Sequence, residues 1–268
     1  PDKSEFVLSL FEQIMQDDLK AQHRSIIDRC VQAVYRPYIA SGYKGDAPTL
    51  TNLQAEIKRQ PEPEAQELAL AAELFISGSL SIFAQKTNVD QNNRLTSYNI
   101  LDLGEQLLPM GMLVILESIY NRVIQNWRAG RRTWVFVDEF SIFFRYPFAT
   151  NFFLRMWKQV RKRAGYMTGI TQNVGEMLTS KDACWMLANS EFLIMLSQSA
   201  SDRAALAELL NISDTQLSYV ENADPGCGLM KFGGAFIPFV NSFPEDTELY
   251  KLMTTKPADR EQVKPHGV

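Results

Sequence analysis

The chain has 268 residues, of which 46% are hydrophobic and 22% are charged, and its formal net charge is −4. This length accommodates one large domain or a core with an appendage, and the composition is typical of a folded globular protein. The negative net charge excludes a chain that is basic all over, so contact with nucleic acid would need a local patch. No run approaches the ~18 uninterrupted apolar residues of a membrane span, and the charged, periodic start does not have the pattern of a signal peptide.

Cysteine and histidine usage argues against a disulfide framework or a zinc site. Cys30, Cys184 and Cys227 are far apart and odd in number, which favours free thiols in a reducing compartment. His23 falls in a helical surface pattern and His266 in the tail, so a zinc site is not expected. Because the chain begins with proline, we expect it to be a fragment of a longer protein.

The first part of the chain has the periodicity of helices. Apolar residues recur at helical spacing through residues 7–14 and 26–35, and we expect Pro37 to end the second helix. Residues 41–49 form a loop by their Gly and Pro content, and Thr51 with Gln54 makes a capping box for a short helix. Residues 64–78 predict another helix. No strand pattern precedes Leu80, so we predict an all-helical subdomain over residues 1–85.

After residue 85, short apolar runs alternate with amphipathic segments. This alternation predicts right-handed βαβ units and a mainly parallel sheet, in an α/β core over residues 86–256. Residues 257–268 are polar and predict a disordered tail. The expected strands are 97–103, 133–140, 166–172 and 191–197, with a hairpin over 228–240 turning at Gly233–Gly234. The expected helices are 111–127, 151–165 closed by Gly165, 201–211, and 213–222 with a Ser213/Gln216 capping box.

Two adjacent carboxylates follow one of these strands. The apolar run 134–137 leads directly into Asp138 and Glu139, at the strand end where parallel sheets bind ligands. Four apolar residues followed by Asp-Glu is the Walker B pattern of nucleotide-hydrolysing motors. There, Asp138 would hold Mg²⁺ through a coordinated water, and Glu139 would polarise the attacking water. The alternative, equally weighted on this motif alone, is that the acids merely cap the strand end.

The next strand ends in Thr171 and Gln172, which can lie beside the carboxylates. An amide at this place can hydrogen-bond both a phosphate oxygen and the attacking water. The alternative is that Gln172 simply begins a loop.

Arginines supply further candidates. Most cations of the helix 151–165 are expected to form a solvated basic face. Arg161 or Arg163 could instead reach the nucleotide of a neighbouring subunit, because a guanidinium stabilises transferring phosphoryl charge. Arg203 is a third candidate, although an ion pair with Asp202 or Glu208 would explain it more simply.

The chain contains no G-x-x-x-x-G-K-[ST] phosphate loop. "SGYKGD" and "GCGLMKFGG" contain glycines but not the Gly-Lys-Ser/Thr ending. These residues therefore offer no backbone cradle for phosphates.

Several long blocks, in order, resemble the large conserved ATPase of conjugative type IV secretion systems, the VirB4 type. They include "TNVDQNNRLTSYNILDLGEQLLPMGMLVILESIYNR", "RTWVFVDEFSIFF", "MTGITQNVGEML", "ANSEFLIMLSQSASDRAALAELLNIS" and "LSYVENADPGCGLMKFGGAFIPFVNSF", and the resemblance runs from about Ser79 to Pro257. It implies a RecA-like P-loop NTPase core with a helical insertion, and ATP and Mg²⁺ as ligands. By position, it makes Asp138 and Glu139 the Walker B acids and Gln172 the glutamine after the next strand, and it places residues 161–163 and Arg203 near nucleotide or a subunit interface.

The same resemblance implies ATP hydrolysis that powers pilus assembly and the transfer of DNA or protein substrates. It implies a peripheral location at the cytoplasmic face of the inner membrane, other secretion subunits as partners, and homo-oligomers, often hexamers. Truncation explains the missing phosphate loop, so we expect this polypeptide to be inactive alone.

Two rival functions stay open. A DNA-pumping coupling protein of the same superfamily would need a basic pore loop, and the net charge and the lack of an aromatic-basic stripe disfavour it. A non-catalytic scaffold would leave the two acids merely structural.

Overall fold

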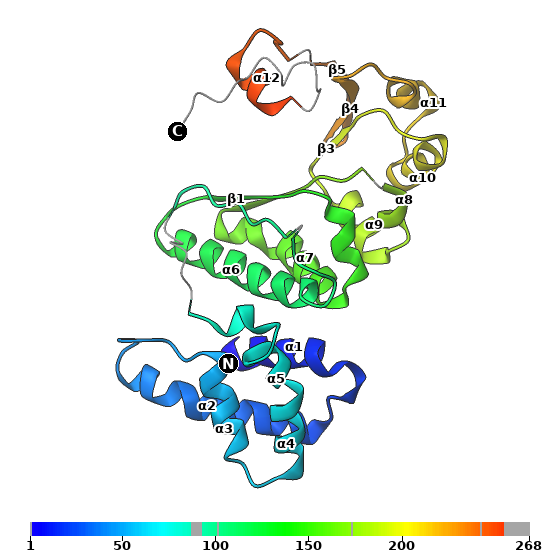
Figure 1. Ribbon diagram of the computed structural model, residues 1–268. Coiled ribbons are helices and arrows are strands. Elements are labelled where there is room, and N and C mark those ends of the chain that lie inside the picture. Colours follow the sequence, from blue (N-terminus) through cyan, green and yellow to red (C-terminus); the bar gives the residue numbers. More distant parts are fainter. Residues whose placement is uncertain (1, 87–92, 101, 173, 242, 255–268) are drawn as a thin grey trace. The chain divides into compact units, whose positions relative to one another are not determined.

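The computed structural model describes residues 2–86, 93–100, 102–172, 174–241 and 243–254 (Figure 1). It divides into two compact units. Unit 1 comprises residues 1–137 and 145–169, and unit 2 comprises residues 138–144 and 170–268. The division predicted near residue 85 stays a prediction.

Helices are the only regular secondary structure among the described residues up to 86. These are α1 (Asp2–Met15), α2 (Ala21–Ala40), α3 (Leu50–Lys58), α4 (Pro63–Ala71) and α5 (Glu73–Ile76), with short 3-10 turns η1 (Gln16–Asp18) and η2 (Ser81–Ala84). Their apolar stripes meet in one core, since an amphipathic helix must bury its apolar face against another element. The most deeply buried members include Phe11, Ile27, Cys30, Ile57 and Leu68.

Three local expectations for these helices are wrong. Helix α2 continues through Pro37 to Ala40, because a proline in the last turn removes only one backbone donor. Helix α3 begins two residues early, with Thr49 and Asn52 forming the capping box. His23 is buried rather than on the surface. Its Nδ1 accepts the Lys20 backbone N–H at 3.1 Å, which leaves Nε2 to donate to Glu67 at 3.1 Å.

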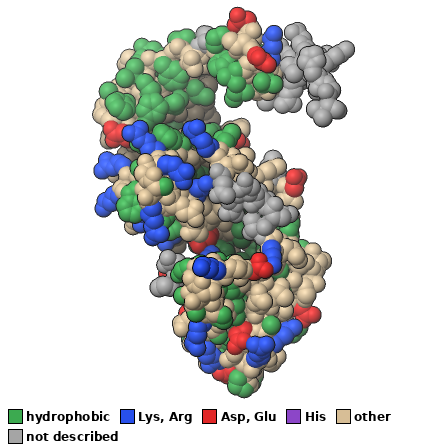
Figure 2. Space-filling model, turned by 90° about the vertical axis from the view of Figure 1, so that its left-hand side faces the viewer, with side chains coloured by type: hydrophobic (Ala, Val, Ile, Leu, Met, Phe, Trp, Pro, Cys, Tyr) green, Lys and Arg blue, Asp and Glu red, His purple; other side chains and the backbone are tan. Residues whose placement is uncertain are grey.

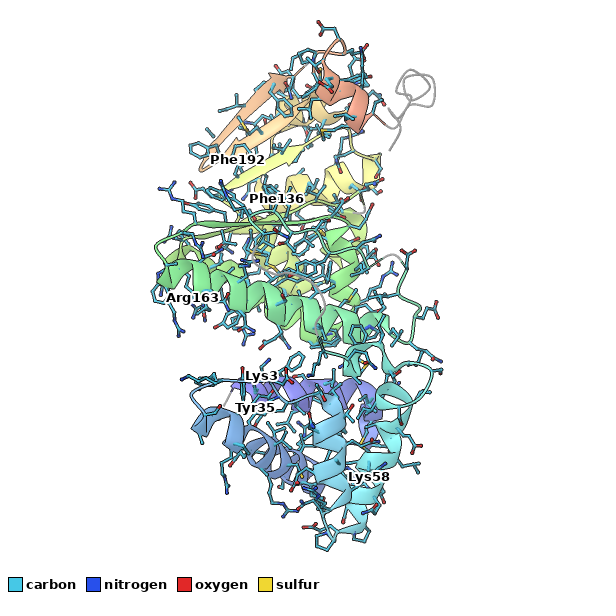
Figure 3. The ribbon with its side chains drawn as sticks, turned by 60° about the vertical axis from the view of Figure 1, so that its left-hand side comes forward. Lys3, Tyr35, Lys58, Phe136, Arg163 and Phe192 are labelled. Atoms are coloured by element: carbon cyan, nitrogen blue, oxygen red, sulfur yellow. The ribbon has the colours of Figure 1, made fainter. Side chains whose placement is uncertain are left out.

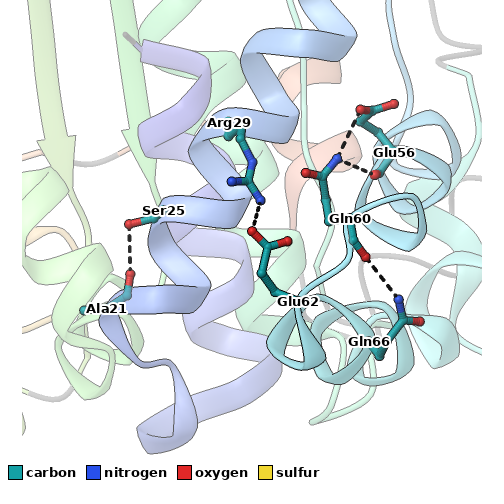
Figure 4. Close-up of polar contacts among 7 residues, drawn as sticks. All are labelled: Ala21, Ser25, Arg29, Glu56, Gln60, Glu62 and Gln66. Carbon is teal, nitrogen blue, oxygen red and sulfur yellow. Dashed lines mark hydrogen bonds and ion pairs between the residues drawn. The ribbon is translucent and has the colours of Figure 1, made fainter.

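Polar contacts tie α2 to the connection between α3 and α4 (Figure 4). Arg29 Nη2 donates to Glu62 Oε1 at 2.7 Å. This hydrogen bond lowers the pKa of the Glu62 carboxyl group, because it stabilises the ionised form. Gln60 donates to the Glu56 carbonyl oxygen at 3.2 Å and accepts from Gln66 at 3.5 Å. Together these contacts fix how the chain turns into α4.

The rest of unit 1 is a two-stranded parallel sheet with helices on one face (Figure 1). Strand β1 (Thr133–Val137) pairs with β2 (Gly165–Gly169), with Thr133 opposite Gly165. The helices are α6 (Leu108–Arg128) and α7 (Pro147–Gln159), with η3 (Phe140–Arg145) before α7 and η4 (Val160–Arg163) after it. None of the helices in the described ranges is long and apolar enough to cross a membrane.

Gly165 does not close the preceding helix, contrary to expectation. Ala164 is the residue that adopts the left-handed conformation, with φ of 51°, and Gly165 begins β2. A Cβ at Gly165 would lie 2.2 Å from Val160 Cγ2. The glycine is therefore needed where η4 packs closely against the start of the strand.

Unit 2 contains α8 (Val174–Leu178), α9 (Lys181–Ala188), α10 (Ala200–Leu210), α11 (Asp214–Leu217), η5 (Ser218–Val220) and α12 (Glu248–Met253). Its sheet is antiparallel, with β4 (Cys227–Phe232) between β3 (Phe192–Met195) and β5 (Ala235–Val240). The expected mainly parallel sheet is thus wrong for the described residues, because β3 pairs with the terminal hairpin. The hairpin turning at Gly233–Gly234 and the Ser213/Gln216 capping box are confirmed.

The strand expected over residues 97–103 is absent from its described part. Residues 97–100 have no regular structure, and a strand requires a hydrogen-bonding neighbour that this segment does not have in the described ranges. Residue 101, His266 and the predicted disordered tail lie outside the described residues.

The cysteines provide a test of the helical core. All three are free, as expected. Burial raises the pKa of the Cys30 thiol to about 11, because an apolar surrounding disfavours the thiolate. At pH 8, we predict that iodoacetamide modifies Cys184 and Cys227, which are partly exposed, and leaves Cys30 unmodified until the protein unfolds. Mass spectrometry with and without denaturant measures this, and equally fast labelling of Cys30 in the native protein would contradict the buried core.

Candidate functional site

A sharp turn directly after β1 sets the candidate site. Glu139 adopts a left-handed backbone conformation with φ of 46°, which is uncommon for a residue with a Cβ. The turn is held on both sides: Asp138 Oδ1 accepts the Glu139 backbone N–H at 3.0 Å, and the Glu139 carbonyl oxygen accepts the Ile142 N–H at 3.0 Å. The conformation costs about 1–2 kcal/mol. Strain of this kind is the basis for a hypothesis of function at Glu139, although Ala164 and Asn211 adopt the same conformation at helix ends.

A second segment of unit 2, which follows β2, lies against this turn. The Phe140 N–H donates to the Ile170 carbonyl oxygen at 2.8 Å. Two residues further on, Gln172 Nε2 donates to Glu139 Oε1 at 2.8 Å. The structure therefore brings the amide and the carboxylate together, although they are separated by 33 positions in the chain.

The arrangement is open to solvent. Asp138 and Gln172 are exposed, and Glu139 and Thr171 are half-buried. No cluster of three or more His, Cys, Asp or Glu side chains that could hold a metal occurs in the described part of the chain. Mg²⁺, however, is commonly bound by one or two carboxylates together with substrate phosphates, so hard oxygen ligands at Asp138 and Glu139 fit it.

Arg203 is fixed within unit 2 by an ion pair. Its Nη2 donates to Glu221 Oε1 at 2.7 Å, and its Nη1 donates to the Gln198 carbonyl oxygen at 3.2 Å. The Arg203 side chain is only 19% exposed, so this charge-assisted pair is screened less than a surface pair. The partner of Arg203 is thus Glu221 and not Asp202 or Glu208, which are near it in the sequence.

Arg161 and Arg163 belong to unit 1. Arg161 is exposed, whereas the Arg163 guanidinium lies over the Tyr120 ring at 5.4 Å from its centroid. The Arg155 guanidinium lies 5.5 Å from the centroid of the same ring. Cation–π contacts of this kind hold both guanidinium groups against α6.

Comparison with solved structures identifies the class of fold. The chain has a fold similar to those of VirB4 and of the plasmid coupling protein TrwB. VirB4 of Thermoanaerobacter pseudethanolicus is similar with a TM-score of 0.72 and 21% identity, covering 91% of this chain and 70% of that one. The plasmid coupling protein TrwB, in complex with the non-hydrolysable GTP analogue GDPNP, is similar with a TM-score of 0.52 and 14% identity. The match covers 92% of this chain and 70% of that one. No family model and no curated protein matches. The expected relation to the VirB4 type is confirmed at the level of the fold.

Sequence reasoning missed two features of these residues. Nothing in the residue type at Glu139 indicates a left-handed backbone, which glycine or asparagine would have signalled. The ion pair between Arg203 and Glu221 joins segments that have no periodic relation in the sequence. The roles of the predicted site residues stay predictions.

The strain at Glu139 can be measured separately from any activity. We predict that Glu139→Gly raises the free energy of unfolding by about 0.5–1 kcal/mol, because glycine adopts this conformation without a steric penalty. Glu139→Gln keeps the Cβ and should leave stability within about 0.5 kcal/mol of the unchanged protein. Urea unfolding of the three proteins measures both values. A loss of more than about 1 kcal/mol in Glu139→Gly would mean that the acid has a structural role.

Proposed function

We propose that this chain is part of an ATPase motor of a conjugative type IV secretion system. The observation that carries the proposal is the hydrogen bond between Gln172 and Glu139, formed next to a strained turn in a VirB4-like fold. In this proposal, ATP hydrolysis powers pilus assembly and the transfer of substrates.

Asp138 and Glu139 would have different roles in nucleotide hydrolysis. Asp138 has one carboxylate oxygen engaged by the Glu139 N–H, which leaves its second oxygen for a water bound to Mg²⁺. Bound Mg²⁺ would neutralise charge on the phosphates. Glu139 would accept a proton from the water that attacks the terminal phosphoryl group, and its fixed backbone would aim the carboxylate.

Gln172 would change its hydrogen-bond acceptor when nucleotide binds. In the structure its amide donates to Glu139. A terminal phosphate oxygen competes for the same donor, and transfer of the amide to phosphate would release the Glu139 carboxylate for water. Thr171, the preceding residue, is a further candidate for contact with the phosphates.

We further propose a homo-oligomer, hexameric in the complete protein, that associates with other secretion subunits at the cytoplasmic face of the inner membrane. Arg161, which is exposed, is the better candidate for reaching a neighbouring nucleotide, because Arg203 is committed to Glu221 and the Arg163 guanidinium lies over Tyr120. A DNA-pumping coupling protein is the second candidate. The higher TM-score of VirB4, 0.72 against 0.52 for TrwB, favours the secretion ATPase.

The proposal predicts different effects for the two acids in the full-length natural protein. Glu139→Gln should keep the affinity for Mg·ATP and lower kcat by about 100-fold or more, because it removes only the proton acceptor. Asp138→Ala should weaken Mg·ATP binding by about tenfold or more, because it removes a metal ligand. Nucleotide titration and phosphate release measure the two effects.

Glu208→Gln provides the matched control, since Glu208 is an exposed acid on α10 of the same unit. It should leave both parameters unchanged. The 268 residues alone have no phosphate loop, so we infer that they do not hydrolyse ATP. Unchanged affinity in Asp138→Ala together with unchanged kcat in Glu139→Gln would support the scaffold function instead.

A further inference from the structure

Positive charge is concentrated in one part of unit 1. Residues 118–137 and 145–169 contain ten lysines and arginines and no aspartate or glutamate, in a chain whose net charge is −4. Eight of the ten are arginines. The negative net charge of the whole chain therefore does not exclude contact with nucleic acid in this part of it.

The fold brings these two segments together at one end of the parallel sheet. The Thr133 N–H donates to the Ala164 carbonyl oxygen at 3.1 Å, and the Arg131 N–H donates to the Asn126 carbonyl oxygen at 2.8 Å. The end of α6, the start of β1 and η4 therefore adjoin, and Figure 3 places Arg163 beside the end of α6. Figure 2 shows lysine and arginine side chains gathered over this region. We call the following side chains the basic patch: Arg128, Arg131, Arg132, Arg161, Lys162 and Arg163.

The charges of the basic patch are not neutralised within the described residues. In that part of the chain, its members have no carboxylate partner. The helical region differs, since Arg24, Arg29 and Arg59 each pair with a glutamate. Five cations of the patch are exposed, and Arg163 is held over Tyr120. Like charges kept close repel one another, so the patch favours an external anion.

Aromatic rings flank the basic patch. Trp127 is 47% exposed in the last turn of α6. Trp134 and Tyr166, opposite one another on β1 and β2, stack with ring centroids 5.0 Å apart and 13° between planes, and both are exposed. Cations that follow a phosphate backbone next to rings that stack on bases are the usual combination in proteins that bind single strands.

We infer that the basic patch binds single-stranded nucleic acid. The predominance of arginine favours phosphate, which a guanidinium contacts with two parallel hydrogen bonds. The rings favour a single strand, because neither a duplex nor a bilayer surface offers unpaired bases to stack on them. The patch belongs to unit 1 and adjoins the first residues of β1 and β2, whereas Asp138 belongs to unit 2 and follows the last residue of β1.

Fluorescence anisotropy with a labelled oligothymidine of about 20 nucleotides tests the inference on the full chain, since single-strand sites span ~4–16 nucleotides. Arg131→Gln/Arg132→Gln should weaken binding by about tenfold or more. It should also lower the slope of log affinity against log salt by about 1.4, because each lost phosphate contact contributes about 0.7. Circular dichroism verifies that the variant folds.

Arg36→Gln/Lys58→Gln is the matched control, since it removes the same charge from two exposed cations of the helical region. It should bind as the unchanged chain does, and so should Glu139→Gln, which separates this inference from the proposed ATPase. An equal loss of oligothymidine affinity in the control would contradict the inference that the basic patch binds the strand. So would unchanged affinity in Arg131→Gln/Arg132→Gln.

Two further probes identify the ligand class. An abasic strand of equal length and charge should bind about tenfold more weakly than oligothymidine, because stacking adds affinity at each base. Vesicles of phosphatidylcholine with phosphatidylserine should not compete at equal phosphate concentration. Equal affinity for the abasic strand would contradict base stacking and mean that the patch binds by charge alone. Competition by the vesicles would mean that the patch binds a membrane surface instead of a nucleic-acid strand.

Discussion

The hydrogen bond from Gln172 to Glu139 is the contact on which the functional interpretation depends. It joins the segment after β1 to the segment after β2, and its acceptor belongs to a residue in a left-handed backbone conformation. A protein gains no stability from a glutamate held there, since a glycine would relieve the strain. The proposed hydrolysis chemistry, which needs a carboxylate, would account for a glutamate at this place.

The two units contribute different kinds of surface. Unit 2 presents carboxylate and amide oxygens at a turn, which suits a magnesium-bound nucleotide. Unit 1 presents the basic patch, whose members have no carboxylate partner within the described residues, next to exposed rings, which suits a phosphate backbone. Arg203 belongs to neither surface, because Glu221 already holds it. A motor that acts on a nucleic-acid substrate would need both kinds of surface. The negative net charge of the whole chain does not reveal the basic patch.

Local pattern predicted much of this fold and some of the site. Most of the helices, β1, β2 and the hairpin at Gly233–Gly234 follow from periodicity and turn residues, whereas α8, α9 and α12 were not predicted. Adjacent strand ends predicted that Gln172 could meet the acids. Pairing partners were harder to predict. Nothing local places β3 beside the terminal hairpin, and residues 97–100 have no strand partner within the described residues. The positive φ of Glu139 is set by contacts on both sides of the turn and not by its residue type.

A crystal structure of the full-length natural protein with Mg²⁺ and a non-hydrolysable ATP analogue tests the central claim most directly. We predict that the terminal phosphate lies within hydrogen-bonding distance of the Gln172 amide and that Glu139 keeps its positive φ. We also predict that Gln172 no longer donates to Glu139 in this state. An analogue bound away from these residues, with the contact between Gln172 and Glu139 intact, would contradict the account.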